Sequence, residues 1–554
     1  MRHSIKQAAF AVVSALATSC SQEGPAPRAN SATVVFDLLE TPVGDVDFPV
    51  SCAPDAAKLV ERGVALLHHM MYAESSFVFN MAADADPDCA MARWGQAMTL
   101  ISPLWPSTPS EDELRRGEKL VSESLATGAR SAREMSYLTT TAAYFQNGTT
   151  RSESERLAQF DEAWQAVSMA HADDTDAKMF SVLASLATLA SQDDPLQQRK
   201  RLGREAEQVL SVFPTHPGAG HYLIHAYDHP ALAPRAKTIA DSYGTITPRV
   251  PHATHMVSHI YVRLGLWDEV IAWNDASADS AWGLCVSTGT INNHYTHALD
   301  YLAYAHLQKA NDAAVAEIIE TLDTLDSPFQ GSLHASAYAL AAIPARFALE
   351  RQDWAQAASL SPQRFESFPW SEEHAPYIAI THFARSLGLA RSGDVEAIGD
   401  EIAAMILLQD QLANPSGYWS KQIEIQIRTA KAWQLHAAGE HANAIGIMEA
   451  AAALEEQLGK HPVTPSAVVP ATDLLGAMLL EQGDPEQAYL AYERSIARSP
   501  NRLNSLYGLA RSARLSGNDP AALEHYRTIV DMSGHGEGHR IRLSEAKREL
   551  RKSR

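Results

Sequence analysis

The chain has 554 residues, 46% of them hydrophobic and 20% charged, which is typical of folded protein and excludes wholesale disorder. Its length exceeds that of one compact core, so we expect two or more units or an extended array. The formal net charge of −21 repels phosphate backbones, and we therefore expect no binding to nucleic acid. With 23 histidines against 4 cysteines, thiolate zinc ribbons and iron–sulfur clusters are disfavoured, and the histidines become the main candidates for chemistry.

The N-terminus has the pattern of an export signal. Two basic residues precede a short apolar run, residues 8–17, that ends in small residues. About ten apolar residues are too few to cross a bilayer of roughly 30 Å as a helix. Two alternatives stay open: Leu16–Cys20 resembles a bacterial lipobox, which would place a lipid anchor on Cys20, whereas simple cleavage after Ala17 needs no anchor. Both predict a bacterial protein that is periplasmic or anchored to the outer membrane, with no other membrane contact.

Export would permit disulfide bonds. Once Cys20 is set aside, Cys52, Cys89 and Cys285 remain. Cys52 and Cys89 flank the first predicted helical hairpin, and a bond between them would join its start to its end. Two buried free thiols are the alternative. We favour the bond, which leaves Cys285 unpaired.

A repeat is clearest near the C-terminus. The segment Gly483–Ala488 recurs as Gly517–Ala522, 34 residues later, and Tyr492 and Tyr526 keep the same offset. Pro500 lies between the two copies, where one helix pair would end and the next begin. This 34-residue period resembles the tetratricopeptide repeat, in which small residues and an aromatic ring pack two antiparallel helices together.

The same turns occur earlier in looser form, and the alanine- and leucine-rich segments between them have helical spacing. No convincing run of alternating strands is present. We therefore predict an all-α fold, a tetratricopeptide-like helix-hairpin solenoid. Its predicted divisions are an export signal (1–20), a flexible tether (21–50), N-terminal helical hairpins (51–200), histidine-rich central helices (201–310), helical repeats (311–430) and C-terminal tetratricopeptide repeats (431–554).

Nine of the 23 histidines lie within one 82-residue stretch, and their spacing is regular. His221 and His225 are four residues apart, as are His255 and His259, and His252 precedes the second pair by three. Residues four apart on a helix share a face, with Cβ atoms about 5–6 Å apart, so both rings can bind one cation. The stretch therefore predicts a metal site rather than a plain scaffold.

Two of these histidines begin a His-x-x-Asp motif: His225 is followed by Asp228, and His297, on a third helix, by Asp300. Such carboxylates can bind a metal or orient a ring. His68, in the first hairpin, could supply one more ligand. The predicted metal ligands are His221, His225, His255, His259, His297, Asp228, Asp300, His252 and His68. The alternative is a buried polar network that fixes helix packing. Imidazoles without thiolates favour copper or zinc as the divalent ion, and aspartate admits iron or manganese.

Several stretches carry distinctive motifs: Leu66–His68, Asp86–Ala92, Trp94–Gly95, His216–Ala226, Pro251–Met256, Ser258–Ile260 and His297–Tyr301. In these stretches, from about residue 50 to 400, the chain resembles an exported bacterial family of tetratricopeptide-repeat proteins. The resemblance implies a helical-repeat fold and a shared histidine-rich core, and it implies no particular reaction. Gly220 departs from the alanine that similar sequences have there.

Three functions follow from these patterns. The first is a metal-dependent enzyme, hydrolytic with zinc or two metals and oxygen-using with a pair of coppers. The second is a scaffold whose concave face binds a peptide, polymer or small molecule. The third is metal storage or delivery. No catalytic residue is assigned, because the chain has no GxSxG motif and no phosphate-binding glycine loop, and Cys285 has no recognisable partner.

Overall fold

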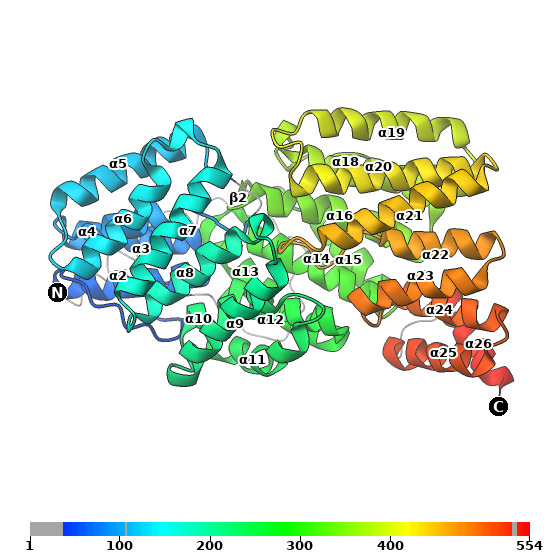
Figure 1. Cartoon of the computed structure of the whole chain (residues 1–554), viewed down its shortest axis with the longest axis horizontal. Coiled ribbons are helices and arrows are strands. Elements are labelled where there is room, and N and C mark those ends of the chain that lie inside the picture. The colour runs from blue at the N-terminus through cyan, green and yellow to red at the C-terminus, as the bar shows by residue number, and fades with distance from the viewer. Residues whose placement is uncertain (1–36, 106–107, 535–539, 554) are drawn as a thin grey trace. The chain divides into compact units, whose positions relative to one another are not determined.

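The computed structural model describes residues 37–105, 108–534 and 540–553 (Figure 1). The predicted export signal and residues 21–36 of the tether lie outside these ranges. The described part contains 25 α-helices and a single pair of two-residue strands, so the all-α prediction is confirmed. Among the described helices, none has the length and apolar character needed to span a bilayer.

The chain divides into two compact units, and the first comprises Ser31–Ile260. Its helices are α2 (Pro54–His68), α3 (Tyr72–Ala85), α4 (Ala90–Met98), α5 (Glu111–Thr127), α6 (Ala132–Phe145), α7 (Glu153–Ala170), α8 (Thr175–Ala187), α9 (Pro195–Val212), α10 (Pro217–Tyr227), α11 (Ala233–Ile246) and most of α12 (Pro251–Leu264), with 3₁₀ turns at Gly148–Thr150 and Leu189–Ser191. Helices adjacent in sequence pack against one another as hairpins.

Local sequence fixes where these helices begin. Ser110, Ser131 and Ser152 each precede a helix, and each side chain accepts a hydrogen bond from the backbone N–H three residues on. A glutamate at that third position bonds back to the serine N–H, which completes a capping box. Two backbone donors are thereby satisfied at each start, so α5, α6 and α7 begin at defined residues.

Glycines let the first hairpins approach closely. The ring of Phe79 on α3 lies between Gly63 on α2 and Gly95 on α4. A Cβ atom would come within 2.8 Å of the ring at Gly63 and within 2.2 Å at Gly95. Only glycine leaves room for the aromatic side chain at these two positions. The predicted disulfide adds a covalent link here: Cys52 and Cys89 are bonded, with Cα atoms 5.0 Å apart, as expected.

The second unit is described from Tyr261 onward. Its helices are α13 (Trp267–Thr288), α14 (Asn293–Gln308), α15 (Asp312–Asp323), α16 (Leu333–Arg351), α17 (Trp354–Ala358), α18 (Ala375–Ser392), α19 (Val395–Asp410), α20 (Tyr418–Ala437), α21 (His441–Leu458), α22 (Ala471–Glu481), α23 (Pro485–Arg498), α24 (Leu503–Leu515), α25 (Asp519–Ser533) and α26 (Ile541–Lys552), with a 3₁₀ turn at Glu372–His374. The strands β1 (Ile291–Asn292) and β2 (Phe329–Gln330) pair in parallel.

The C-terminal repeat has the predicted register. Helices α23 and α25 begin 34 residues apart, and α22–α23 and α24–α25 form two hairpins (Figure 1). The ring of Tyr492 lies between Gly476 and Gly508, where a Cβ would approach it to 2.6 and 2.2 Å. The spacing of 16 residues on either side of the aromatic is the same as around Phe79. One packing rule therefore builds hairpins in both units. Cys285, on α13, is buried and outside any disulfide, as predicted.

Candidate metal centre

Helices α10 and α12 carry the predicted histidines of the first unit. At the start of α10, Pro217 occupies the first turn and the ring Nδ1 of His216 accepts a hydrogen bond from the Ala219 N–H, at 3.3 Å. Helical periodicity then places His221 and His225 on one face, one turn apart. Both are buried, at 0% and 7% exposure, so they lie inside the unit rather than in solvent.

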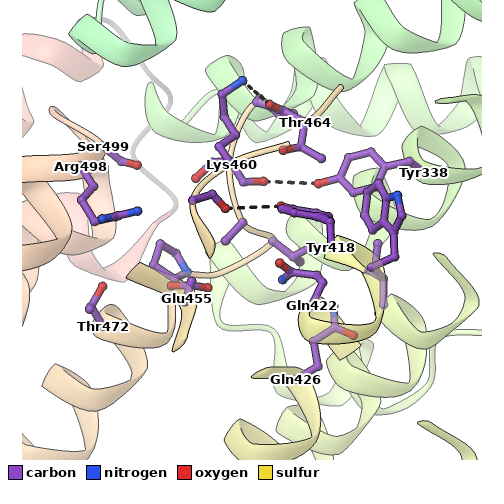
Figure 2. Close-up of a pocket in the computed structure, with 18 of the residues that line it drawn as sticks. Tyr338, Tyr418, Gln422, Gln426, Glu455, Lys460, Thr464, Thr472, Arg498 and Ser499 are labelled. Atoms are coloured by element: carbon purple, nitrogen blue, oxygen red, sulfur yellow. Dashed lines mark hydrogen bonds between the residues drawn. The ribbon is translucent and has the colours of Figure 1, made fainter. Parts of the chain in front are cut away.

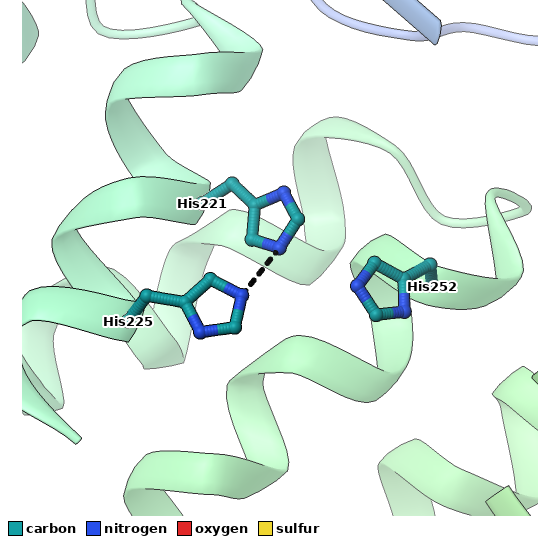
Figure 3. A group of neighbouring side chains, drawn as sticks. All are labelled: His221, His225 and His252. Carbon is teal, nitrogen blue, oxygen red and sulfur yellow. Dashed lines mark hydrogen bonds between the residues drawn. The ribbon is translucent and has the colours of Figure 1, made fainter. Parts of the chain in front are cut away.

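Three rings converge where α10 faces α12 (Figure 3). The Nε2 atoms of His221 and His225 are 3.1 Å apart, and the ring of His252 lies 5.1 Å from that of His221. One ligand nitrogen from each of the three lies within 4.8 Å of the other two. Nitrogens that share one metal ion, at about 2.0–2.1 Å each and angles of about 90–110°, are about 3–3.4 Å apart, so the α10 pair already has that spacing.

The backbone sets the proton position on His221. Its Nδ1 is 2.7 Å from the carbonyl oxygen of His68, which can only accept, so Nδ1 carries the proton and Nε2 carries the lone pair. Burial, together with the neighbouring His69 and His259, lowers the pKa of His221 to about 3, so the ring is neutral near pH 7. A neutral imidazole with a fixed tautomer is the form that binds metals.

A second pair lies on α12. The Nε2 atoms of His255 and His259 are also 3.1 Å apart, and the Nδ1–H of His259 donates to Asp228 at 3.0 Å. Asp228 thus acts as the partner of a ring N–H, one of its two predicted roles. The rings of His225 and His259 are 5.7 Å apart, and those of His252 and His255 are 6.0 Å apart. The two pairs and His252 form one buried group, which we call the five-histidine cluster: His221, His225, His252, His255 and His259.

The structure places the side chain of His68 in a second group, with Asp176 and His216, in which one ligand atom of each residue lies within 4.8 Å of the other two. The Nε2–H of His68 donates to Asp176 at 2.9 Å, and its Nδ1 accepts from the Tyr222 hydroxyl at 3.0 Å. The Nε2 of His216 lies 3.5 Å from the same carboxylate. The side chain of His68 therefore belongs to this separate group. Its backbone carbonyl accepts the Nδ1–H of His221.

Sequence reasoning missed Asp176, because it lies 108 residues from His68 and belongs to no motif. The hydrogen bonds within this second group suit a polar network. The Nδ1 of His216 accepts a backbone N–H, so its Nε2 carries the proton and points toward the carboxylate. We interpret His68, Asp176 and His216 as a buried polar network that joins α2, α8 and α10.

His297 and Asp300 lie on α14, in the second unit, and both are buried. Asp300 forms an ion pair with Arg346 of α16, which is also fully buried. Burial raises the pKa of Asp300 to about 6, and Arg346 limits the rise. Asp300 is predicted to serve a metal, and in the structure one of its carboxylate oxygens pairs with Arg346. This pairing could not be predicted from the sequence, since Arg346 is 46 residues away.

The second unit also contains a pocket with a mixed lining (Figure 2). Lys460 donates to the Thr464 carbonyl at 2.9 Å, and the Tyr338 hydroxyl donates to the Ser466 carbonyl at 3.3 Å. Burial raises the pKa of Glu455, which accepts a backbone N–H, to about 7. Aromatic rings, amides and both signs of charge around one pocket can recognise a small polar molecule.

Comparison with known proteins gives no family. No family model and no curated protein matches the chain. Among solved structures, the human IFIT1 dimer with PPP-AAAA is 12% identical, with 88% of this chain and 96% of that chain covered at a TM-score of 0.35. Yeast Tom70 is 10% identical, with 90% of this chain and 96% of that chain covered at a TM-score of 0.28. The P58(IPK) TPR domain is 11% identical, with 90% of this chain and 99% of that chain covered at a TM-score of 0.21. These scores are too low to indicate function, and the architecture rests on the helical hairpins themselves.

Proposed function

We propose that this helical-repeat protein binds a divalent transition-metal ion through His221, His225 and His252. The observation that carries the proposal is the convergence of three buried imidazole nitrogens within 4.8 Å of one another. The fixed tautomer of His221 supports it, because a backbone carbonyl on Nδ1 is a common way to orient a metal-binding ring. The alternative is a polar network alone, to which the hydrogen bond between the His221 and His225 rings would then belong.

The donor set bears on the identity of the metal. Three imidazoles and no thiolate suit copper or zinc. Asp228 supports the same choice, because one of its oxygens accepts the His259 N–H and so supports an imidazole. Three protein nitrogens also leave a fourth position for water, as in catalytic zinc sites, so a metal-dependent enzyme is the leading function. Metal storage or delivery is the alternative.

The disulfide supports the proposed location. Cys52–Cys89 requires an oxidising compartment, which agrees with export to the periplasm or outer membrane. The pocket of the second unit supports a further role in binding a small molecule or a segment of a protein partner. We propose that role as secondary, because nothing in the pocket lining singles out one ligand.

Metal content of the purified chain tests the proposal. After dialysis against zinc or copper and removal of excess ion, we expect stoichiometric metal by elemental analysis. Replacing His225 with Ala removes one of three ligands and should weaken binding by more than about 100-fold, beyond the 10–100-fold cost of losing a supporting partner. His306→Ala, a buried histidine of α14, is the control and should retain full metal. Full metal in both variants would refute the site.

A further inference from the structure

The α12 pair repeats the geometry of the α10 pair with a different support. In each pair two Nε2 atoms are 3.1 Å apart across one helical turn. In each pair one ring has its Nδ1–H bonded to an acceptor: the His68 carbonyl holds His221, and the Asp228 carboxylate holds His259. In each pair this ring's Nε2 accepts a hydrogen bond from the Nε2–H of the second ring. A metal ion that displaced the shared proton would have two nitrogens at the spacing it needs.

The acceptors behind the two pairs differ in charge, and this difference affects the binding of a second cation. A carbonyl bonded to His221 is neutral, whereas Asp228 is a carboxylate, 6% exposed, behind His259. A negative charge behind the ring raises its basicity and lowers the cost of placing a second positive ion beside the first. The α12 pair is thus better suited than the α10 pair to bind the second metal ion.

We infer that His255 and His259 hold a second divalent metal ion, so that the five-histidine cluster is a dinuclear centre. The inference rests on the proposed function, which supplies the first ion at His221, His225 and His252. The ring of His225 lies 5.7 Å from that of His259, and the ring of His252 lies 6.0 Å from that of His255. Ions held by neighbouring pairs can then share one bridging oxygen ligand from water, as two-metal sites with ions about 3.5–4 Å apart do.

A dinuclear centre defines the class of ligand that the site would take. Two metal ions would polarise a small oxygen-containing group bound to both, and the neutral imidazoles around them would add no charge of their own. The cluster is buried, so the ligand must be small. We therefore assign water, hydroxide or a molecule of that size as the bridging species, rather than a polymer.

Copper titration with spin quantitation separates one ion from two. Full-length wild-type protein should bind two Cu²⁺ per chain, with an electron paramagnetic resonance signal well below that of one isolated Cu²⁺, because bridged ions couple their spins. His259→Ala should bind one Cu²⁺ with the full signal of a single ion. Asp228→Asn should keep the first ion and bind the second about 10–100-fold more weakly. His171→Ala, a histidine of the same unit that bonds Ser136, is the control and should behave as wild type.

The outcomes distinguish the two proposals. One Cu²⁺ per wild-type chain, with a full signal that His259→Ala leaves unchanged, would overturn the dinuclear centre and leave the first site intact. Two Cu²⁺ without spin coupling, or two retained by His259→Ala, would also overturn it. No bound Cu²⁺ at all would refute the proposed function itself. Asp228→Asn keeps the side-chain size, so it remains informative if His259→Ala fails to fold.

Discussion

Single residues decide whether the histidine pattern can hold a metal. Spacing of four along a helix predicted that His221 and His225 share a face, as do His255 and His259, and the structure places them so. Spacing says nothing about ring protonation, which depends on what lies behind each ring. The His68 carbonyl comes from α2, a contact that spans 153 residues, so it could not be predicted from the sequence.

Arg346 provides a test of the role that the structure gives Asp300. Both side chains are fully buried and paired, so Arg346→Met should leave an uncompensated buried carboxylate and destabilise the protein by about 3–5 kcal/mol. Combining it with Asp300→Asn should recover much of that loss, because the buried charge is then gone. Thermal melts of the two single variants and the double variant measure this. A double variant as unstable as the sum of the singles would contradict a direct pairing.

Glu455 should make stability depend on pH in a defined direction. Burial raises its folded-state pKa from 4.5 to about 7. The folded state therefore holds the proton more tightly than the unfolded state, and this contribution to stability is lost as pH rises from about 4.5 to 7. Glu455→Gln keeps a neutral acceptor for the Ala471 N–H, so it should melt a few degrees above wild type at pH 8 and close to wild type at pH 4.

Calorimetry at the two pH values measures the difference. The same difference in melting temperature between Glu455→Gln and wild type at pH 4 and at pH 8 would contradict the prediction. It would show that the protonation of Glu455 is not linked to folding.

At the scale of helices, a ring between two glycines sets how closely hairpins pack. Gly508→Ala would place a Cβ 2.2 Å from the Tyr492 ring, which cannot be accommodated without moving the ring or the helix. We expect a loss of about 1–3 kcal/mol, the usual cost of overpacking. Gly446→Ala is the matched control: it lies within α21 with no neighbouring atom inside 4 Å of the added Cβ. It should instead stabilise by about 0.5–1 kcal/mol, because alanine favours helix.

Thermal unfolding of both variants would show opposite shifts. Equal stabilisation by the two substitutions would mean that helix propensity, and not contact with Tyr492, governs the effect.

The hairpins were predictable because their determinants are local. A glycine, an aromatic and a turn at fixed spacing specify helix starts and packing within about 34 residues, as α22–α25 show. The division into two units was not predictable in this way. It falls between Ile260 and Tyr261, inside α12 and inside the predicted central segment, 201–310. The helical pattern is unbroken there, and only contacts between distant parts of the chain define the boundary.

At the scale of the whole molecule, the Cys52–Cys89 disulfide bond contributes to the free energy of unfolding. The bond closes a loop of 37 residues, which restricts the unfolded chain and stabilises by about 2–4 kcal/mol. Cys89→Ser should therefore lower the melting temperature of the first unit, and reductant should lower that of wild type without a further effect on the variant. Peptide mapping without reduction is the direct check. Two free thiols at Cys52 and Cys89 in exported protein would contradict the bond.

The central claim is that His221, His225 and His252 bind a metal ion in the first unit. Anomalous X-ray diffraction from crystals of zinc- or copper-loaded protein, recorded on both sides of the metal absorption edge, tests it most directly. We predict a strong anomalous peak about 2.0–2.1 Å from a ring nitrogen of each of the three residues. A peak only at surface carboxylates, or no peak among these rings in fully loaded protein, would contradict the account.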